Sequence, residues 1–222
     1  MQTKPQPSVW QLTKVGLDQY RKFLLIPVTI FVINTFVSMI VRTFDVGAQT
    51  STLTETWAPT ALISVLAIHT PMYLMTPKLI ALAGAPEKLS KLALRLIGLG
   101  LIAFNLLLWG MLFAVEYLAN IQGAHWNLKL LLITLAGFFI ADQAAYTIAS
   151  IYLKQSSNIQ VAVWIIVYSM LLAAAIASLV VLAVFELTGY VFGFEALLLV
   201  VPGAFLVLSA LLSLNTPLLR RA

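Results

Sequence analysis

The chain contains no cysteine among its 222 residues. This absence excludes a disulfide framework, a thiolate nucleophile and a cysteine-based metal site. Charged residues are also scarce, because they make up 9% of the sequence, whereas a soluble domain carries roughly a quarter. Hydrophobic residues account for 61% and the mean hydropathy is +0.99. The composition therefore predicts a polytopic membrane protein whose main solvent is lipid.

Several patterns that carry chemistry are missing as well. The sequence has no GxxxxGK[ST] phosphate loop, no HExxH zinc spacing and no GxSxG nucleophile turn. The two histidines, His69 and His125, belong to different segments. A hydrolase triad drawn from Ser64, His69 and Asp142 therefore lacks a supporting motif. We expect no enzymatic activity, no cofactor and no metal site in this chain.

Six apolar stretches are each long enough to cross about 30 Å of hydrocarbon. They lie near residues 23–43, 58–77, 93–117, 128–152, 161–187 and 194–216. Backbone groups cannot stay unpaired in lipid, and runs such as LLLWGMLFAV are apolar on every face, so these stretches should be helices. We predict an all-α transmembrane domain of six helices over residues 23–216.

The distribution of basic residues predicts the orientation of this domain. If the N-terminus is cytoplasmic, only Arg42 and Lys129 of the thirteen Lys and Arg residues fall on the outer side, which leaves eleven inside. This split follows the positive-inside bias. Both termini, including the tail 217–222, are then cytoplasmic, and we expect a multi-pass protein of the bacterial cytoplasmic membrane. The net charge of +5 indicates contact with an anionic leaflet rather than with nucleic acid.

The first 22 residues lack the small-residue cleavage motif of a signal peptide. Residues 9–24, VWQLTKVGLDQYRKFL, place most apolar side chains in one half of a helical wheel, with Trp10 among them. Thr13 and Val15 are the exceptions. This segregation predicts an interfacial helix within the cytoplasmic segment 1–22 that leads into the first span.

Five polar residues lie inside the predicted spans. His69 and Asp142 are near the middle of the second and fourth spans, Gln143 follows Asp142, and Asn34 and Asn105 have similar depths in the first and third. A charge in hydrocarbon costs about 2.5–3.5 kcal/mol on insertion scales. Pairing of His69 with Asp142 would satisfy both groups and join two helices. The alternatives are a role of these five residues in a substrate path or in gating, and a neutral, buried Asp142 without an important partner.

Small residues predict where helices approach closely. The fourth span carries Gly137, Ala141, Ala145 and Ala149 at four-residue spacing, and the fifth carries the pairs Ala173/Ala177 and Ala174/Ser178. Such small-xxx-small ridges let another helix pack tightly in a membrane. They indicate packing and give no information about a substrate.

The connector after the second span concentrates charge around a break in helical pattern. Within PKLIALAGAPEKLSKLALRL, residues 77–96, four basic residues surround the sequence Gly84-Ala85-Pro86-Glu87; these are Lys78, Lys88, Lys91 and Arg95. Glycine permits an unusual backbone angle or a close approach, and proline suits the start of a helix. Positive-inside anchoring explains the charges but does not explain the break.

The order of a basic amphipathic N-terminus, six spans and a short connector after span two resembles small bacterial permease subunits of the type-2 ABC exporter family. In many of these the second span ends in a segment similar to P-x-x-[IL]-x-L-G-x-[ST]-[RK]-[RK]. The corresponding residues here are Pro77, Ile80, Leu82, Gly84 and Lys88. The sequence departs from the pattern in two places, because Ala83 precedes the glycine and Pro86-Glu87 replaces a hydroxyl residue and a base.

This resemblance implies a specific mechanical role for the connector. Residues 78–92 would form a coupling helix docked on a separate cytoplasmic ATP-binding subunit, which alone would bind ATP and Mg²⁺. The residues carried over to this role are Gly84, Ala85, Pro86, Glu87, Lys88 and Lys91. A second permease, identical or different, would complete the pore. The expected substrate is hydrophobic or amphipathic, such as a peptide, an antimicrobial or a lipid.

Two other classes of function remain open. An ion-coupled secondary carrier would use Asp142 and His69 as a protonation pair. A non-transporting membrane scaffold or immunity protein would recruit partners through its spans.

Overall fold

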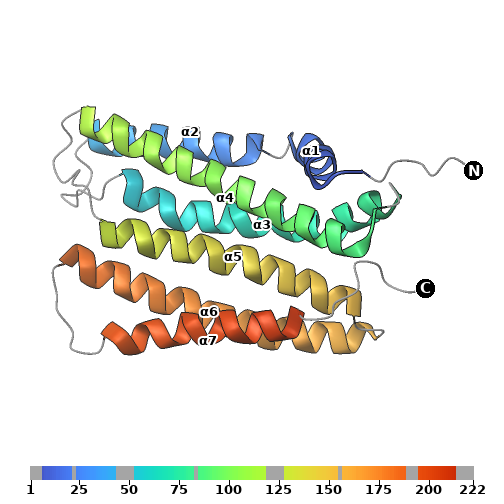
Figure 1. Cartoon of the computed structure of the whole chain (residues 1–222). Coiled ribbons are helices and arrows are strands. Elements are labelled where there is room, and N and C mark those ends of the chain that lie inside the picture. The colour runs from blue at the N-terminus through green and yellow to red at the C-terminus, as the bar shows by residue number, and fades with distance from the viewer. Residues whose placement is uncertain are drawn as a thin grey trace, which may run out of the picture.

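The computed structural model describes residues 7–21, 24–43, 53–82, 85–118, 128–154, 157–188 and 195–213. These ranges contain seven α-helices and no strand, so the predicted all-α class is confirmed for them (Figure 1). The helices are α1 (Val9–Tyr20), α2 (Leu25–Thr43), α3 (Leu53–Leu82), α4 (Glu87–Leu118), α5 (Leu128–Lys154), α6 (Asn158–Thr188) and α7 (Glu195–Ser213).

The long helices lie side by side and alternate in direction along the chain (Figure 1). The start of α2, the junctions of α3 with α4 and of α5 with α6, and the end of α7 therefore point toward the same end of the bundle. Helix α1 lies at this same end, turned away from the direction of the others. We call this end the connector end.

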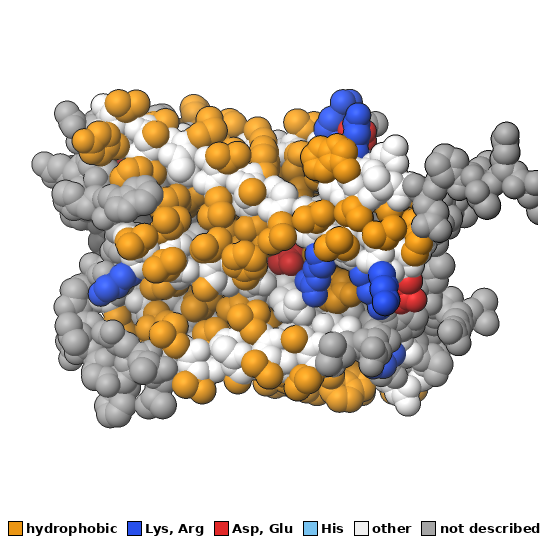
Figure 2. Space-filling model, in the orientation of Figure 1, with side chains coloured by type: hydrophobic (Ala, Val, Ile, Leu, Met, Phe, Trp, Pro, Cys, Tyr) orange, Lys and Arg blue, Asp and Glu red, His pale blue; other side chains and the backbone are white. Residues whose placement is uncertain are grey.

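The helices carry the length and composition of a membrane protein. Within the described ranges, three are long and apolar enough to cross a membrane: α4, α5 over Leu131–Lys154, and α6 over Asn158–Phe185. Shorter apolar helical segments lie in α3, over Ala61–Thr76, and in α7, over Leu198–Ser213. Hydrophobic side chains cover most of the visible surface between the two ends (Figure 2). These features indicate a multi-pass membrane protein.

Helix α5 packs through its ridge of small residues, as predicted. Gly137, Ala141, Ala145 and Ala149 are all buried, and they face α3. A Cβ atom added to Gly137 would lie 3.0 Å from Cδ2 of Leu62, so the glycine permits the close approach of the two helices. The small residues predicted in α6 do not pack on another described helix of this chain, because Ala173, Ala174 and Ala177 are exposed and Ala175 is buried instead.

Helix α1 packs one of its faces against the bundle. The helix begins with a capping box, in which the backbone N–H of Gln11 donates to Ser8 Oγ and that of Ser8 donates to Gln11 Oε1. Leu12 and Thr13 are buried, whereas Trp10 is exposed. Thr13 fits inside because its hydroxyl donates to the carbonyl of Val9, 2.9 Å away. The small Gly16 allows this face to lie against Ile97 of α4.

The connector is shorter than the predicted segment 78–92. Helix α3 continues through Pro71 and Pro77 to Leu82, and α4 begins at Glu87. The break therefore covers only residues 83–86, of which 83 and 84 lie outside the described residues. Pro86 caps the start of α4, because its carbonyl accepts from both the backbone N–H and the hydroxyl of Ser90, at 3.0 Å each. Glu87 in the first turn complements the helix dipole.

Candidate functional site

The carboxylate of Asp142 on α5 is the centre of a cluster of polar side chains from three helices. Its Oδ1 atom accepts hydrogen bonds from Nδ1 of His69 and from Oη of Tyr73, both at 2.6 Å. Its Oδ2 atom lies 3.6 Å from Nη1 of Arg95 on α4. His69 and Tyr73 are four positions apart on α3, so they lie on the same face of that helix. We call His69, Tyr73, Arg95 and Asp142 the polar cluster.

The polar cluster is embedded in apolar packing. His69, Tyr73 and Asp142 are buried, and only Arg95 reaches the surface, with a side chain 35% exposed. The buried residues packed nearby are Ile68, Met72, Leu94, Ile97, Leu101 and Ala145. An isolated carboxylate in such surroundings would cost several kcal/mol. Two hydrogen-bond donors and one opposite charge offset that cost for Asp142.

The geometry assigns the donor nitrogen of His69. Because Nδ1 faces a carboxylate oxygen, it is assigned as the donor. The other nitrogen, Nε2, is buried without a hydrogen-bond partner among the described residues. The imidazole therefore presents its Nδ1–H to Asp142.

Gly98 allows α4 to approach the polar cluster. A Cβ atom at this position would lie 2.8 Å from Oδ1 of Asp142 and would overlap the hydroxyl of Tyr73. Any other residue would push α4 away from the other two helices or displace these side chains. Gly98 lies about one turn after Arg95 on α4, and no motif in the sequence marks it for this role.

Tyr146 on α5 fixes the direction of Arg95. The central carbon of the guanidinium lies 3.8 Å above the centroid of the Tyr146 ring. The same ring meets Tyr73 edge to face, with centroids 5.1 Å apart. Arginine stacks well on aromatic faces because its guanidinium is planar and weakly hydrated. Arg95 is thus held in the seam between α4 and α5 by a charge contact and a ring contact.

The other polar residues predicted in the spans do not join this cluster. Gln143 points to α7, where its Nε2 lies 3.4 Å from the hydroxyl of Ser213, and it belongs with Thr147 to a second set of polar contacts. Asn105 is buried in α4 and donates to the carbonyl of Leu101 at 2.9 Å. Asn34 lies in α2, but its side chain is outside the described residues.

The second set of polar contacts joins α5, α6 and α7 on the opposite side of α5. The hydroxyls of Tyr168 and Ser209 lie 2.5 Å apart, and Thr147 lies 3.3 Å from the carbonyl of Ser209. Both residues of the adjacent pair Asp142 and Gln143 are therefore used, one toward α3 and α4 and the other toward α7. Helix α5 therefore lies between α3 and α4 on one side and α6 and α7 on the other, and it contributes polar side chains to both sides.

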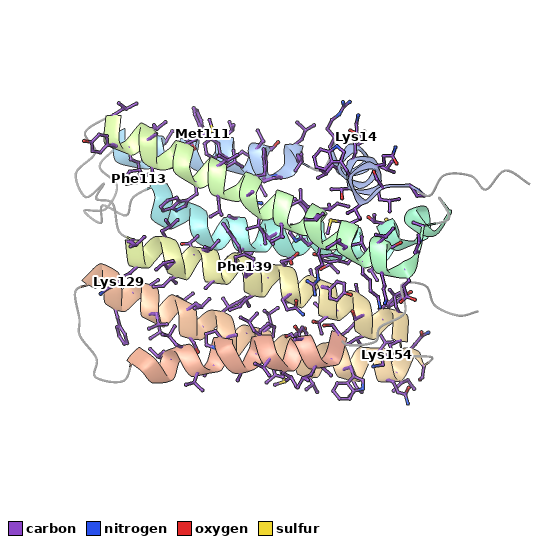
Figure 3. The ribbon with its side chains drawn as sticks, viewed as in Figure 1. Lys14, Met111, Phe113, Lys129, Phe139 and Lys154 are labelled. Atoms are coloured by element: carbon purple, nitrogen blue, oxygen red, sulfur yellow. The ribbon has the colours of Figure 1, made fainter. Side chains whose placement is uncertain are left out.

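The connector residues lie at the end of the bundle, away from the centre of the cluster. Gly84 is outside the described residues; Ala85 is half-buried, and Pro86, Glu87 and Lys88 are exposed. Nζ of Lys91 lies 2.9 Å from Oε1 of Glu87, so these two charges form an exposed i,i+4 pair within α4. Lys14 and Lys154 also lie toward the connector end, whereas Lys129 lies at the other end (Figure 3).

The residues missed by sequence reasoning are Tyr73, Arg95 and Gly98. Arg95 stands among the connector cations in a count of charges, yet it points into the seam beside Asp142. Its setting in the apolar run LALRLIGLG, two turns after Glu87, is the signal that separates it from Lys88 and Lys91.

Comparison of this chain with protein-family models, with curated protein sequences and with solved structures gave no match.

Proposed function

We propose that this chain is the membrane-embedded permease subunit of an ABC exporter, driven by a separate cytoplasmic ATP-binding subunit. In this proposal α2 to α7 are the six membrane spans. The shortest, α2 and α7, have 19 residues each, which corresponds to about 28 Å of helix and matches a hydrocarbon core. The connector end, which holds the break at 83–86, would face the cytoplasm.

The observation that carries this proposal is the path from the connector to the polar cluster along α4. The connector ends where α4 begins, at Glu87, and Arg95 follows two turns later. Arg95 contacts Asp142 on α5, which in turn is hydrogen-bonded to His69 and Tyr73 on α3. A helix is stiff over this length, so a displacement of the connector would be transmitted to the place where three helices meet.

The chemistry of the first turn of α4 suits contact with another protein. Pro86, Glu87 and Lys88 are exposed there. The exposed Lys88 can pair with an acidic group on a partner, and such a pair raises the specificity of docking. In the proposed complex the partner binds ATP and Mg²⁺, and a second permease, identical or different, completes the path for a hydrophobic or amphipathic substrate such as a peptide, an antimicrobial or a lipid.

The test is purification of the tagged chain from its native membranes under mild conditions. We expect an ATP-binding subunit to copurify, and the complex to hydrolyse ATP while the isolated chain does not. Lys88→Glu should reduce the copurified ATPase. Lys129→Glu is the matched control, because it makes the same change at the other end of the bundle. Equal recovery of an ATPase with both variants, or of none with the native chain, would contradict the proposal.

A second candidate is an ion-coupled carrier, which the contact between His69 and Asp142 favours. An intramembrane carboxylate hydrogen-bonded to a histidine is a common arrangement for exchange of a proton. In proteoliposomes that contain only this chain, such a carrier would move substrate when a proton gradient is imposed. Asp142→Asn should abolish that movement. Transport that requires ATP and a partner subunit would exclude this candidate.

A further inference from the structure

Three basic side chains form a ladder on one face of α4 at the connector end. Lys88, Lys91 and Arg95 are three and four positions apart, so successive members lie about one helical turn from each other. The ladder is about 10 Å long at the rise of an α-helix. It runs from the exposed Lys88 to Arg95 in the seam between α4 and α5.

The innermost member of the ladder is held in place but is incompletely paired. The Arg95–Asp142 contact of 3.6 Å is longer than a hydrogen bond. The guanidinium also interacts with the hydroxyl of Tyr73. Arginine carries five N–H donors in a planar fork, and these two partners engage only part of it. The ring of Tyr146 meanwhile fixes the plane of this fork.

Lys91 is similarly available. Its partner Glu87 is on the first turn of α4, where the glutamate side chain is 58% exposed. Exposed i,i+4 pairs contribute little to stability and exchange readily with other ions. An anion that contacted both Lys91 and Arg95 would therefore replace only the weak ion pair between Lys91 and Glu87.

Exposed leucines flank the ladder. Leu92, Leu96 and Leu99 are exposed on α4, and two of them directly follow Lys91 and Arg95 in the chain. Basic and apolar surfaces thus lie beside each other over the same turns. Acidic and basic side chains interrupt the hydrophobic surface between the middle of the molecule and the connector end (Figure 2).

We propose that Arg95 and Lys91 bind the phosphate of an anionic lipid headgroup. Lys88 supplies additional charge at the outer rim, and the three leucines contact the acyl chains. Guanidinium groups recognise phosphate oxygens in a bidentate manner, and basic sites between membrane helices on the cytoplasmic side suit anionic headgroups. A side chain that only snorkelled to water would extend away from the bundle, whereas Arg95 stacks on Tyr146. This site rests on the cytoplasmic placement of the connector end that the proposed function also uses. It requires neither transport nor a partner subunit, and the lipid-binding arms on Lys91 and Arg95 test it separately from the docking test on Lys88.

The experiment is a lipid titration of the purified, delipidated full chain, followed by native mass spectrometry. Phosphatidylglycerol is compared with phosphatidylcholine of the same acyl chains. We expect preferential binding of phosphatidylglycerol, and about fivefold weaker binding for Lys91→Gln and for Arg95→Gln. Lys129→Gln, at the other end of the bundle, should bind as the native chain does. Equal binding of both lipids, or equal binding by Lys91→Gln, overturns the proposal.

Two further measurements are needed. The first distinguishes a lipid phosphate from free phosphate, and the second distinguishes lost binding from failure of a variant to fold. Inorganic phosphate at millimolar concentration should not displace phosphatidylglycerol; full displacement would assign the site to free phosphate instead of a lipid. Arg95→Lys keeps the charge without the planar fork, and we expect binding between that of the native chain and that of Arg95→Gln. Lys91→Gln leaves the polar cluster intact, so it decides the question even if Arg95→Gln fails to fold.

Discussion

The Oδ1 atom of Asp142 lies 2.6 Å from Nδ1 of His69, although the two residues are 73 positions apart in sequence. This hydrogen bond joins α5 to α3 inside an apolar bundle, where each partner would otherwise be unsatisfied. The same oxygen also accepts from Tyr73. One carboxylate therefore fixes the rotation of α5 relative to α3 and gives α4 an anchor for Arg95.

Asp142→Ala should destabilise the protein by about 3–5 kcal/mol, because it leaves buried donors on α3 and the Arg95 charge without their acceptor. Thermal or denaturant unfolding in detergent measures this loss. Gln143→Ala is the control at the next position, where the side-chain contacts are 3.4 Å long, and it should cost about 1 kcal/mol or less. Equal losses for the two variants would show that the polar cluster contributes no more to the free energy of unfolding than the contacts of Gln143.

Gly98→Ala should destabilise the protein by about 1–3 kcal/mol through overpacking. The new methyl group would collide with the Tyr73 hydroxyl and lie 2.8 Å from Oδ1 of Asp142. Gly110→Ala on the same helix is the control, because nothing lies within 4 Å of the added atom. It should stabilise the helix by about 0.5–1 kcal/mol. The two melting temperatures should therefore move in opposite directions, and a shift of both in the same direction contradicts the geometry.

Hydropathy and residue spacing predict much of this architecture. Apolar length locates each long helix, with ends that differ from the predicted bounds by up to six residues in α3 and α4, since lipid allows few alternatives to a helix. The four-residue spacing from Gly137 to Ala149 predicts the face of α5 that packs on α3. These features are local, or they repeat along one helix, so a single sequence contains them.

The composition of the polar cluster was not predictable in the same way. His69 and Asp142 stand out because charged and imidazole groups are rare in apolar segments, but their contact depends on the rotation of two helices. Arg95 lies close to a loop in the sequence, so it is grouped with the basic residues expected at the membrane surface. In the structure its side chain lies instead between α4 and α5. Tyr73 and Gly98 matter only through neighbours on other helices, and no pattern along the chain marks such a contact.

The sidedness of the bundle can be measured because the native chain has no cysteine. Single substitutions Lys88→Cys, Lys154→Cys and Lys129→Cys are treated with a membrane-impermeant maleimide in intact cells and in inverted vesicles. We expect Lys129→Cys to react in intact cells, and the other two only in inverted vesicles, because both lie at the connector end. Reaction of Lys88→Cys in intact cells would place the connector outside and contradict the exporter proposal.

The docking of α1 on α4 gives the last prediction. A Cβ atom at Gly16 would overlap the end of the Ile97 side chain and lie 3.7 Å from Thr76, so a larger residue should force α1 away from the bundle. Leu12 is buried in that contact, and Leu12→Cys should therefore react slowly with maleimide. Adding Gly16→Leu should raise the reaction rate, whereas Val15→Leu, at an exposed position on the same helix, should not. Since Ile97 and Gly98 are neighbours on α4, Gly16→Leu should also lower the stability that the polar cluster provides. An unchanged Leu12→Cys rate in the Gly16→Leu background would mean that α1 is not held by this contact.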